Sequence, residues 1–259
     1  MSEETRAPDM GSEPNPAPNV GPDRATTRDT APEPNAELDP APTRESAPEP
    51  DHEPGSAAPE RGVGPWPGGP ENWPDGDQWD RELLANGDAR NVIDKYRYWT
   101  VEAIRADLDS DRHSFHVAIE NFHHDSNIGS VVRSANAFGA QAVHVVGRKR
   151  WNRRGAMVTD RYQHIHHHES VDAFLEWARA EGIAVVGIDI TSTSTPMEGY
   201  AFPKECILVF GQESTGLSAQ MTAGCDDVVH ITQYGSTRSI NVGAAAAVAM
   251  WAWVQSERA

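Results

Sequence analysis

Two short apolar runs near the C-terminal end of the sequence each stop abruptly at a loop, and this pattern restricts the fold more than any other feature. The first run covers residues 207–210 and stops at Gly211, and the second covers residues 228–231 and leads into a polar loop at 232–238. Short apolar runs that end in loops are typical of buried parallel strands. Open α/β sheets bind ligands in the crevice outside such strand ends, so we expect a ligand site there.

Three polar side chains accompany these predicted strand ends. Glu213 lies in the first loop between Gly211 and Gly216, which leave the backbone accessible. Ser239 and Asn241 follow the second loop and precede an alanine-rich helix. Serine and asparagine are also common helix-capping residues, so capping alone could explain that pair. A surface carboxylate is the alternative for Glu213.

Helix and strand patterns alternate along the rest of the folded part. They predict helices at 81–98, 100–108, 127–138 and 171–180, and strands at 115–119, 142–146 and 183–190. This alternation predicts an α/β fold, in which a parallel sheet carries helices on both faces. The last helix is apolar nearly all round, through Met250, Trp251, Trp253 and Val254, and such a helix requires burial.

The first part of the chain differs in composition. Residues 1–80 hold 17 of the 19 prolines, and 18 acidic residues against five basic ones. So few apolar side chains cannot offset the entropy cost of ordering the chain, and we expect residues 1–60 to be a disordered, acidic, proline-rich tail. Trp66, Trp73 and Trp79 come next, among further prolines and glycines. They either pack as an extended arm or belong to a flexible linker.

This composition sets the expected domain limits and explains the charge. Residues 61–112 are predicted to form the extended arm and N-terminal helices, and residues 113–259 the main folded domain. The first 80 residues contribute −13 to the formal net charge of −17. The acidic balance therefore does not argue against nucleic-acid binding by the folded part.

Several classes of protein are disfavoured by what the sequence lacks. No apolar run is long enough to span a bilayer, and the acidic N-terminus lacks the apolar core of a signal peptide. Cys206 and Cys225 are the only cysteines, too few for a disulfide framework, which favours a reducing cytoplasm. Neither GxGxxG after the first strand nor GxxxxGK[ST] occurs, so a nicotinamide cofactor or a nucleoside triphosphate is disfavoured.

A basic segment follows the strand predicted at 142–146. Six cations lie within fourteen residues, against the single acid Asp160: Arg148, Lys149, Arg150, Arg153, Arg154 and Arg161. Trp151 lies among them. Basic loops with an embedded aromatic residue are typical of surfaces that contact phosphates and stack on bases, so we predict nucleic-acid binding here. A solvated charged loop is the alternative.

Three histidines, His164, His166 and His168, alternate along the chain and could share one face of a strand. Such a set raises the possibility of zinc. No carboxylate or cysteine partner stands at a clear spacing from them, so we predict no metal site.

Three short motifs occur in order between residues 115 and 255. The first contains Asn127-Ile128-Gly129, Arg133, Ala135 and Phe138-Gly139, the second is Phe210-Gly211-Gln212-Glu213-Ser214-Thr215-Gly216-Leu217, and the third is Ser239-Ile240-Asn241-Val242 with the alanine run. In these motifs the sequence resembles the SpoU (TrmH-like) family of SPOUT RNA ribose 2′-O-methyltransferases. Each motif alone is weakly specific, whereas three in order at plausible spacings are a specific signature.

The resemblance implies a fold, a cofactor and an assembly. The implied SPOUT fold has a C-terminal trefoil knot, which periodicity could not reveal. The implied cofactor is S-adenosylmethionine, held by the backbone at Gly211, Ile231 and Ile240, with Ile190 and Ser239 near it. Ordinary strand and helix packing is the alternative for Ile231 and Ile240. The implied assembly is a homodimer that covers the C-terminal helix.

The implied reaction is methyl transfer to a ribose 2′-hydroxyl, in which Arg133 activates the hydroxyl. A solvated surface arginine is the alternative, because its helical phase places Arg133 opposite Val131, Val132 and Ala135. A guanidinium stays protonated in proteins, so we expect Arg133 to stabilise the developing alkoxide and contact the adjacent phosphate rather than act as a base.

The other motif residues receive supporting roles from the resemblance. Asn127 and Glu213 are expected to orient the guanidinium, and Ser239 and Asn241 to belong to the catalytic group. A helix cap is the alternative for Asn127.

The substrate and the activity itself leave choices open. Transfer RNA is the favoured substrate, because the N-terminal extension is short and resembles no ribosomal-RNA recognition domain, and ribosomal RNA is the alternative. A catalytically idle relative that only binds RNA, or an unrelated α/β enzyme that uses a different nucleotide, would also fit the sequence.

Overall fold

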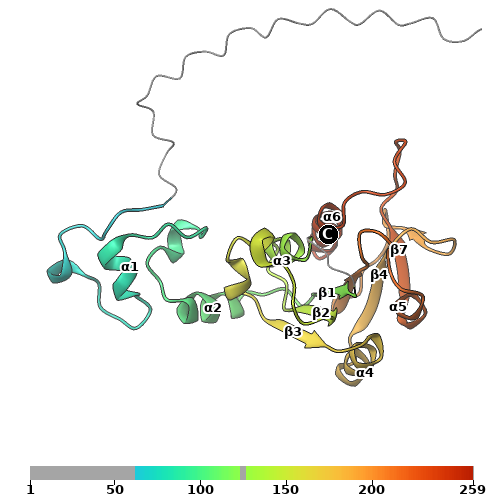
Figure 1. Ribbon diagram of the computed structural model, residues 1–259, viewed down its shortest axis with the longest axis horizontal. Coiled ribbons are helices and arrows are strands. Elements are labelled where there is room, and N and C mark those ends of the chain that lie inside the picture. The colour runs from blue at the N-terminus through green and yellow to red at the C-terminus, as the bar shows by residue number, and fades with distance from the viewer. Residues whose placement is uncertain (1–61, 123–126, 259) are drawn as a thin grey trace, which may run out of the picture. The chain divides into compact units, whose positions relative to one another are not determined.

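The computed structural model of the protein describes residues 62–122 and 127–258. Within these residues the centre of the fold is a seven-stranded sheet in the order β3-β2-β1-β6-β4-β7-β5 (Figure 1). The strands are β1 (His116–Asn121), β2 (Val143–Gly147), β3 (Ile165–His168), β4 (Ala184–Ile188), β5 (Thr195–Pro196), β6 (Cys206–Phe210) and β7 (Asp227–His230). Every neighbouring pair runs parallel, which confirms the predicted α/β class with a parallel sheet.

Helices lie on both faces of this sheet, as predicted (Figure 1). The helices are α1 (Arg81–Asn86), α2 (Val101–Asp109), α3 (Ile128–Ala137), α4 (Val171–Glu181), α5 (Ala219–Gly224) and α6 (Val242–Ser256), with short 3₁₀ turns η1 (Pro70–Asn72), η2 (Asp94–Tyr96), η3 (Arg153–Ala156) and η4 (Thr159–Arg161). Val117 and Ile119 of β1 share a core with α3 and α6, whereas Ala118 between them shares a core with α4 and α5. Alternate side chains of a strand point to opposite faces, so β1 contributes to both cores.

Capping residues set the ends of the helices that were predicted well. The Thr100 side chain accepts a hydrogen bond from the Ala103 amide at the start of α2 (3.2 Å), and Ser170 accepts one from the Ala173 amide at the start of α4 (3.1 Å). Gly182 ends α4 in the left-handed conformation, with φ of 72°. These are standard start and stop signals, so both helices lie within one residue of their predicted limits.

The helix predicted at 81–98 is wrong in its extent, because α1 stops before Gly87, which has φ of 92°. Asp88 follows, and it is 1% exposed. Its carboxylate forms an ion pair with Arg90 (2.7 Å) and accepts a hydrogen bond from the Tyr98 amide (2.9 Å). A buried carboxylate needs such partners, so the chain turns around Asp88 instead of continuing as a helix.

Three elements were absent from the predicted succession: β3, β5 and α5. Each is short, and β3 consists of an isoleucine followed by three histidines. An apolar-run criterion misses such strands, although the alternating histidines did indicate a strand face.

The N-terminal part of the described chain packs around aromatic side chains. The Trp66 ring meets the rings of Trp79 and Tyr98 edge-on, with centroids 5.6 Å and 5.3 Å apart. The guanidinium of Arg81 lies over the Trp73 ring. Arg112 connects this part to the segment between η4 and β3, because it donates to the Tyr162 carbonyl (2.8 Å). The predicted tail, residues 1–60, lies outside the described residues, and the predicted domain limits stay a prediction.

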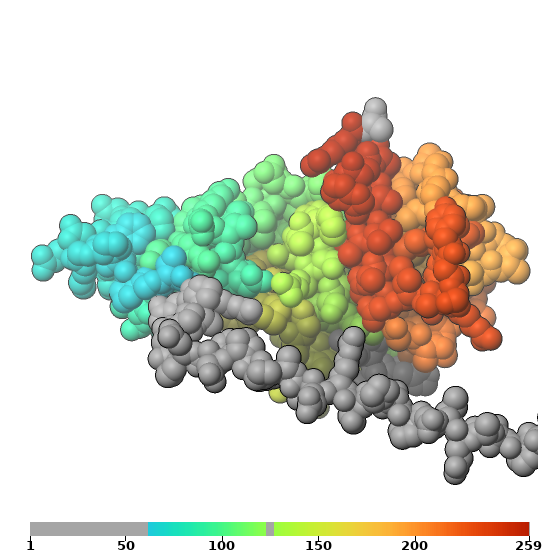
Figure 2. Space-filling model, turned by 90° about the horizontal axis from the view of Figure 1, so that it is seen from above, coloured from blue at the N-terminus to red at the C-terminus, as the bar shows by residue number. Residues whose placement is uncertain are grey.

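Helix α6 lies beside α3 at the surface, where Figure 2 shows it in red next to the yellow-green segment. Its Trp253 is buried, whereas Trp251 is 52% and Val248 is 43% exposed. Part of this apolar helix is therefore uncovered in a single chain. Every helix within residues 62–122 and 127–258 is too short or too polar to span a lipid bilayer.

Candidate functional site

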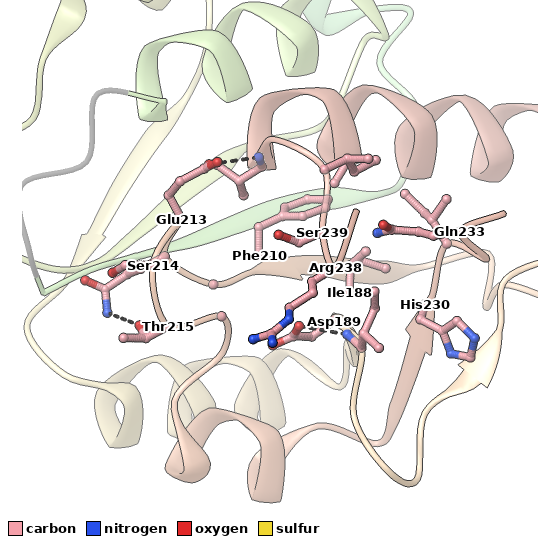
Figure 3. A pocket seen from close by; sticks show the side chains of 18 residues that line it. Ile188, Asp189, Phe210, Glu213, Ser214, Thr215, His230, Gln233, Arg238 and Ser239 are labelled. Carbon is pink, nitrogen blue, oxygen red and sulfur yellow. Dashed lines mark hydrogen bonds between the residues drawn. The ribbon is translucent and has the colours of Figure 1, made fainter. Parts of the chain in front are cut away.

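A cavity of about 370 Å³ opens where β4, β6 and β7 end and α6 begins (Figure 3). We call it the strand-end cavity. All five residues predicted to lie near the cofactor line it: Ile190, Gly211, Ile231, Ser239 and Ile240. Ile190 is 50% and Ile240 38% exposed, so the cavity presents apolar side chains to a ligand.

The loop after β6 forms one wall of the strand-end cavity and folds back tightly on itself. The amides of Gln212 and Gly216 each donate to the other residue's carbonyl, at 3.0 Å and 2.9 Å. A Cβ atom on Gly211 would lie 2.0 Å from the Gly216 carbonyl carbon and 2.1 Å from the Leu217 nitrogen. Gly216 has φ of 67°, a conformation that favours glycine. The sequence positions of both glycines are therefore fixed by backbone geometry.

Two carboxylates that the sequence patterns did not single out hold this loop in place. Asp189, which follows β4 and lines the cavity, accepts hydrogen bonds from the Leu217 amide (2.8 Å) and the Ile190 amide (2.7 Å). Glu120, fully buried in β1, accepts from the Ser218 amide (2.7 Å) and hydroxyl (2.6 Å). A charged residue inside an apolar strand was the available signal for Glu120, and a polar residue at a strand end was the signal for Asp189.

Burial raises the pKa of Glu120, and the negative charge of Asp189 acts in the same direction, against the two hydrogen bonds from Ser218. Glu120 has no contact with the solvent in this position, so it acts as a support for the loop.

Glu213 forms a polar cluster with Asn127 and Asn241, residues that three separate segments bring together. One oxygen of Glu213 accepts three hydrogen bonds. They come from the side-chain amide of Asn127 (3.1 Å), the side-chain amide of Asn241 (3.3 Å) and the backbone amide of Val242 (3.0 Å). The Asn241 side chain also donates to the Asn127 side-chain oxygen (3.0 Å). A carboxylate beside the first amides of α6 is placed favourably with respect to the helix dipole.

The structure distinguishes the two asparagines for which helix capping was the alternative. Asn241 does cap α6, because its side-chain oxygen accepts from the amides of Gly243 (2.9 Å) and Ala244 (3.3 Å). Asn127 stands at the N-cap position of α3 but its side chain makes no capping bond. Its side chain contacts Glu213 and Asn241 instead.

Arg133 is not brought to that cluster. It lies on the exposed side of α3, less than two turns beyond Asn127, and it is not in the wall of the strand-end cavity. Among residues 62–122 and 127–258, no hydrogen bond or ion pair engages its guanidinium. The expected orientation of this guanidinium by Asn127 and Glu213 stays a prediction.

Some residues of the basic segment line a second cavity, and the others lie on the open surface. Lys149 and Arg153 line a cavity of about 420 Å³, which we call the basic cavity and which runs along β3. Arg153 lies over the Trp151 ring (5.5 Å) and forms an ion pair with Asp160 (3.3 Å). The remaining members of the predicted set are exposed and outside the cavity wall: Arg148, Arg150, Arg154 and Arg161.

The histidines form a row across three strands rather than a metal cluster. His144, fully buried in β2, is hydrogen-bonded to His116 (3.0 Å) and to His168 (2.9 Å). Burial lowers the pKa of His144 to about 2 and that of His116 to about 4, so both imidazoles are neutral at pH 7. His164 pairs with Asp109 instead (2.8 Å). In the part of the chain that the structure describes, no group of three or more potential ligands is placed to hold a metal ion.

Residues 114–251 match the model of the SpoU rRNA Methylase family, so more than half of the chain is covered. The protein belongs to this family, which confirms the resemblance seen in the sequence motifs.

Curated relatives agree with this assignment. The chain is 31% identical over 149 residues to the tRNA (guanosine(18)-2′-O)-methyltransferase TARBP1 of Mus musculus, which covers 51% of this chain and 9% of that protein. It is 24% identical over 136 residues to the tRNA (guanosine(18)-2′-O)-methyltransferase of Borreliella burgdorferi, covering 51% of this chain and 62% of that protein. The match therefore spans less than two thirds of these relatives.

Solved structures show the same fold. The SpoU methyltransferase AviRb from Streptomyces viridochromogenes, in complex with the cofactor AdoMet, superposes with a TM-score of 0.52 at 26% identity, over 59% of this chain and 64% of that chain. The TrmH/SpoU tRNA modifying enzyme of A. aeolicus gives a TM-score of 0.54 at 20% identity, over 61% of this chain and 82% of that one.

Proposed function

We propose that this protein transfers a methyl group from S-adenosylmethionine to a ribose 2′-hydroxyl of RNA, with tRNA as the favoured substrate. One observation carries the proposal: the strand-end cavity gathers all five predicted cofactor residues beside the cluster of Glu213, Asn127 and Asn241. Membership of the SpoU family and the names of two tRNA 2′-O-methyltransferases among the relatives support it.

The strand-end cavity fits S-adenosylmethionine in size and in chemistry. Its volume of about 370 Å³ lies in the usual range for small-molecule sites. Ile190 and Ile240 offer an apolar surface for adenine, and Gly211, Ile231 and Ile240 offer backbone groups for its polar edge. Ser239, also in the wall, would contact the same ligand. When bound, the cofactor supplies a methyl carbon on a sulfonium, from which the ribose 2′-oxygen takes it as the carbon–sulfur bond breaks.

The protein's main contribution to this reaction is alignment, which can supply roughly 7–11 kcal/mol of the barrier. Asn127, Glu213 and Asn241 join the start of α3 to the start of α6. This link supports the proposal that α3 carries Arg133 at a set position relative to the cavity mouth. We propose that Arg133 stabilises the negative charge that develops on the ribose oxygen, while the hydroxyl proton passes to solvent. Its protonated guanidinium also suits the neighbouring phosphate.

We extend the proposal to the chain as a whole. Residues 113–259 would form the SPOUT methyltransferase domain with the C-terminal trefoil knot, and contact between the segments after β6 and β7, through Glu213 and Val242, supports this. The exposed Trp251 and Val248 of α6 support a homodimer through this helix. An RNA-modifying role is consistent with a cytoplasmic location.

Calorimetric titration with S-adenosylmethionine, followed by methyl transfer to bulk tRNA and rRNA, tests the proposal. Binding with transfer to a ribose 2′-oxygen is the expected result. Binding without transfer would indicate the catalytically idle RNA-binding alternative, and no binding would reject the cofactor. Mapping 2′-O-methyl groups in RNA from cells with and without the protein would identify the substrate.

A further inference from the structure

The basic cavity combines residues from three parts of the chain, one of which lies outside the region that matches the family. Arg105 comes from α2, Lys149 and Arg153 from the basic segment, and His166 and His167 from β3. The family match begins at residue 114. Arg105 therefore brings a cation to this cavity from the N-terminal part of the chain.

The charges in the cavity wall favour an anion. Three permanent cations, Arg105, Lys149 and Arg153, face one carboxylate, Asp160, which is already paired with Arg153 at 3.3 Å. The histidines of the wall add no negative charge, and burial lowers the pKa of His166. The wall thus keeps an excess of positive charge at neutral pH.

Arg105 has an unused donor in this position. One terminal nitrogen donates to the Arg161 carbonyl, which holds the side chain against η4. Its Nε is buried, yet within residues 62–122 and 127–258 no acceptor receives its hydrogen. The Nε has almost no accessible surface, so a ligand in the cavity would meet the part of the Arg105 side chain that lines the wall rather than this atom. Guanidinium groups bind phosphate particularly well, because two donors can reach two oxygens.

We infer that the basic cavity binds a phosphodiester of the RNA substrate, with Arg105 and Lys149 as its principal contacts. The inference rests on the proposed function, and it adds a defined RNA site that reaches beyond the methyltransferase motifs. The cavity, at about 420 Å³, is large enough to admit a phosphate with part of its nucleotide. Trp151, which lies in the wall with Arg153 over its ring, adds an apolar surface beside the phosphate.

The test uses the full-length protein and unfractionated tRNA, with dissociation constants measured between about 50 and 200 mM salt. Arg105→Met and Lys149→Met each remove one cation from the cavity and keep an unbranched side chain. Each variant should bind tRNA more weakly at low salt, and its salt slope should fall by roughly 0.7–0.9. Arg179→Met is the matched control, because Arg179 is exposed on α4 and outside the cavity wall, and it should leave the slope unchanged.

Two further measurements separate the possible failures. Lys149 is exposed, so Lys149→Met remains informative if Arg105→Met lowers the unfolding temperature. S-adenosylmethionine affinity should be the same in all variants. If wild-type protein binds tRNA and both cavity variants match its affinity and slope, the cavity inference is wrong while the proposed function stands. Failure of the wild type to bind any RNA would reject both.

Small anions provide the last arm of the test. Inorganic phosphate and uridine monophosphate are titrated against the wild type and the two cavity variants. Weak, salt-sensitive competition with tRNA is the expected result. Tight saturable binding of either small anion, with tRNA binding unaffected by the variants, would assign the cavity to a free ligand and overturn the RNA assignment.

Discussion

The two cavities of this protein differ in what lines them. The strand-end cavity lies between residues 188 and 245, where loop backbone, two glycines and apolar side chains line it together with Asp189, Glu213, His230 and Arg238, and close packing of the loop after β6 sets its form. The basic cavity is shaped by long cationic side chains and rings between residues 105 and 167. Steric changes should therefore destroy the first cavity, whereas charge changes should weaken the second. This contrast allows cofactor binding and RNA binding to be altered separately.

The largest expected effect comes from a single methyl group in the strand-end cavity. Gly211→Ala would place a Cβ 2.0 Å from the Gly216 carbonyl carbon and 2.1 Å from the Leu217 nitrogen, and both of these are backbone atoms of the loop. The loop after β6 must move, so we expect loss of detectable S-adenosylmethionine binding by calorimetry and a stability loss of about 1–3 kcal/mol. Binding of tRNA should persist, because the basic cavity is untouched.

Gly235→Ala is the control for that experiment, because a Cβ there meets no atom within 4 Å and Gly235 lies outside the left-handed region. It should bind the cofactor like the wild type. Normal cofactor affinity in Gly211→Ala would show that the loop is not the rigid wall described above.

The next effect concerns Arg133, which belongs to neither cavity wall. Arg133→Ala should lower kcat for methyl transfer by about 10²–10³-fold, the usual loss for one group that stabilises an oxyanion. Cofactor affinity should stay near the wild-type value, because Arg133 serves the acceptor side. Arg179→Ala, which removes an exposed arginine on α4, should leave kcat unchanged. Retention of most activity by Arg133→Ala would reject the proposed mechanism.

A smaller effect concerns the strands beneath the basic cavity. His144 is fully buried, and the His166 ring stacks on it, with centroids 5.2 Å apart. The pKa of His144 is lowered in the fold from 6.5 to about 2. Its contribution to stability is therefore complete above pH 6.5 and declines as the pH falls below that value, because only the unfolded chain binds the proton. At pH 5 the decline amounts to about 2 kcal/mol.

His144→Gln tests that pH dependence, since glutamine can still form hydrogen bonds with His116 and His168 but does not titrate. Denaturant unfolding at pH 7 and pH 5 should show a pH-induced loss that is about 2 kcal/mol smaller in the variant than in the wild type. For each protein, the quantity compared is the change in unfolding free energy between pH 7 and pH 5. A lower absolute stability of the variant therefore does not affect the comparison. Equal losses would mean that His144 is protonated within the fold.

The difference between the two cavities also explains which parts of the sites the sequence could predict. Gly211, Ser239 and Ile240 lie in short contiguous motifs. The strand ends predicted a ligand crevice near Gly211 and Ser239, and the family resemblance predicted that all three would lie near the cofactor; the structure places all three in the wall of one cavity. The role of Arg105 could not be predicted, because it depends on a helix that packs against a loop more than fifty residues later. The chain reversal at Asp88 escaped prediction for a related reason, since its partners include the amide of Tyr98, ten residues away.

The sequence patterns also did not predict the strained backbone between η3 and η4. Met157 and Val158, between η3 and η4, have φ of 49° and 71°. A β-branched residue rarely adopts this conformation, and no residue pattern predicts it. The preceding turn η3 packs tightly against α3: a Cβ on Gly129 would be 2.7 Å from the Ala156 nitrogen. Such tertiary constraints become visible only in three dimensions.

The smallest expected effect involves the acidic N-terminal residues and would sharpen the contrast between the cavities. Residues 1–60 are rich in acidic side chains, and the basic cavity is the cationic one, so a tethered polyanion could compete with RNA there and not at the strand-end cavity. The flexible tether that the composition predicts for residues 1–60 would give an effective concentration of up to about 1 mM. Deletion of residues 2–60 should then tighten nonspecific tRNA binding at low salt, with a gain that shrinks as salt screens the charges. Cofactor affinity should not change.

The alternative is that these residues only aid solubility, in which case truncated and full-length proteins give identical tRNA binding curves at low salt. Combining the deletion with Lys149→Met locates the competition: if it occurs at the basic cavity, the deletion should gain less affinity in that variant than in the wild type.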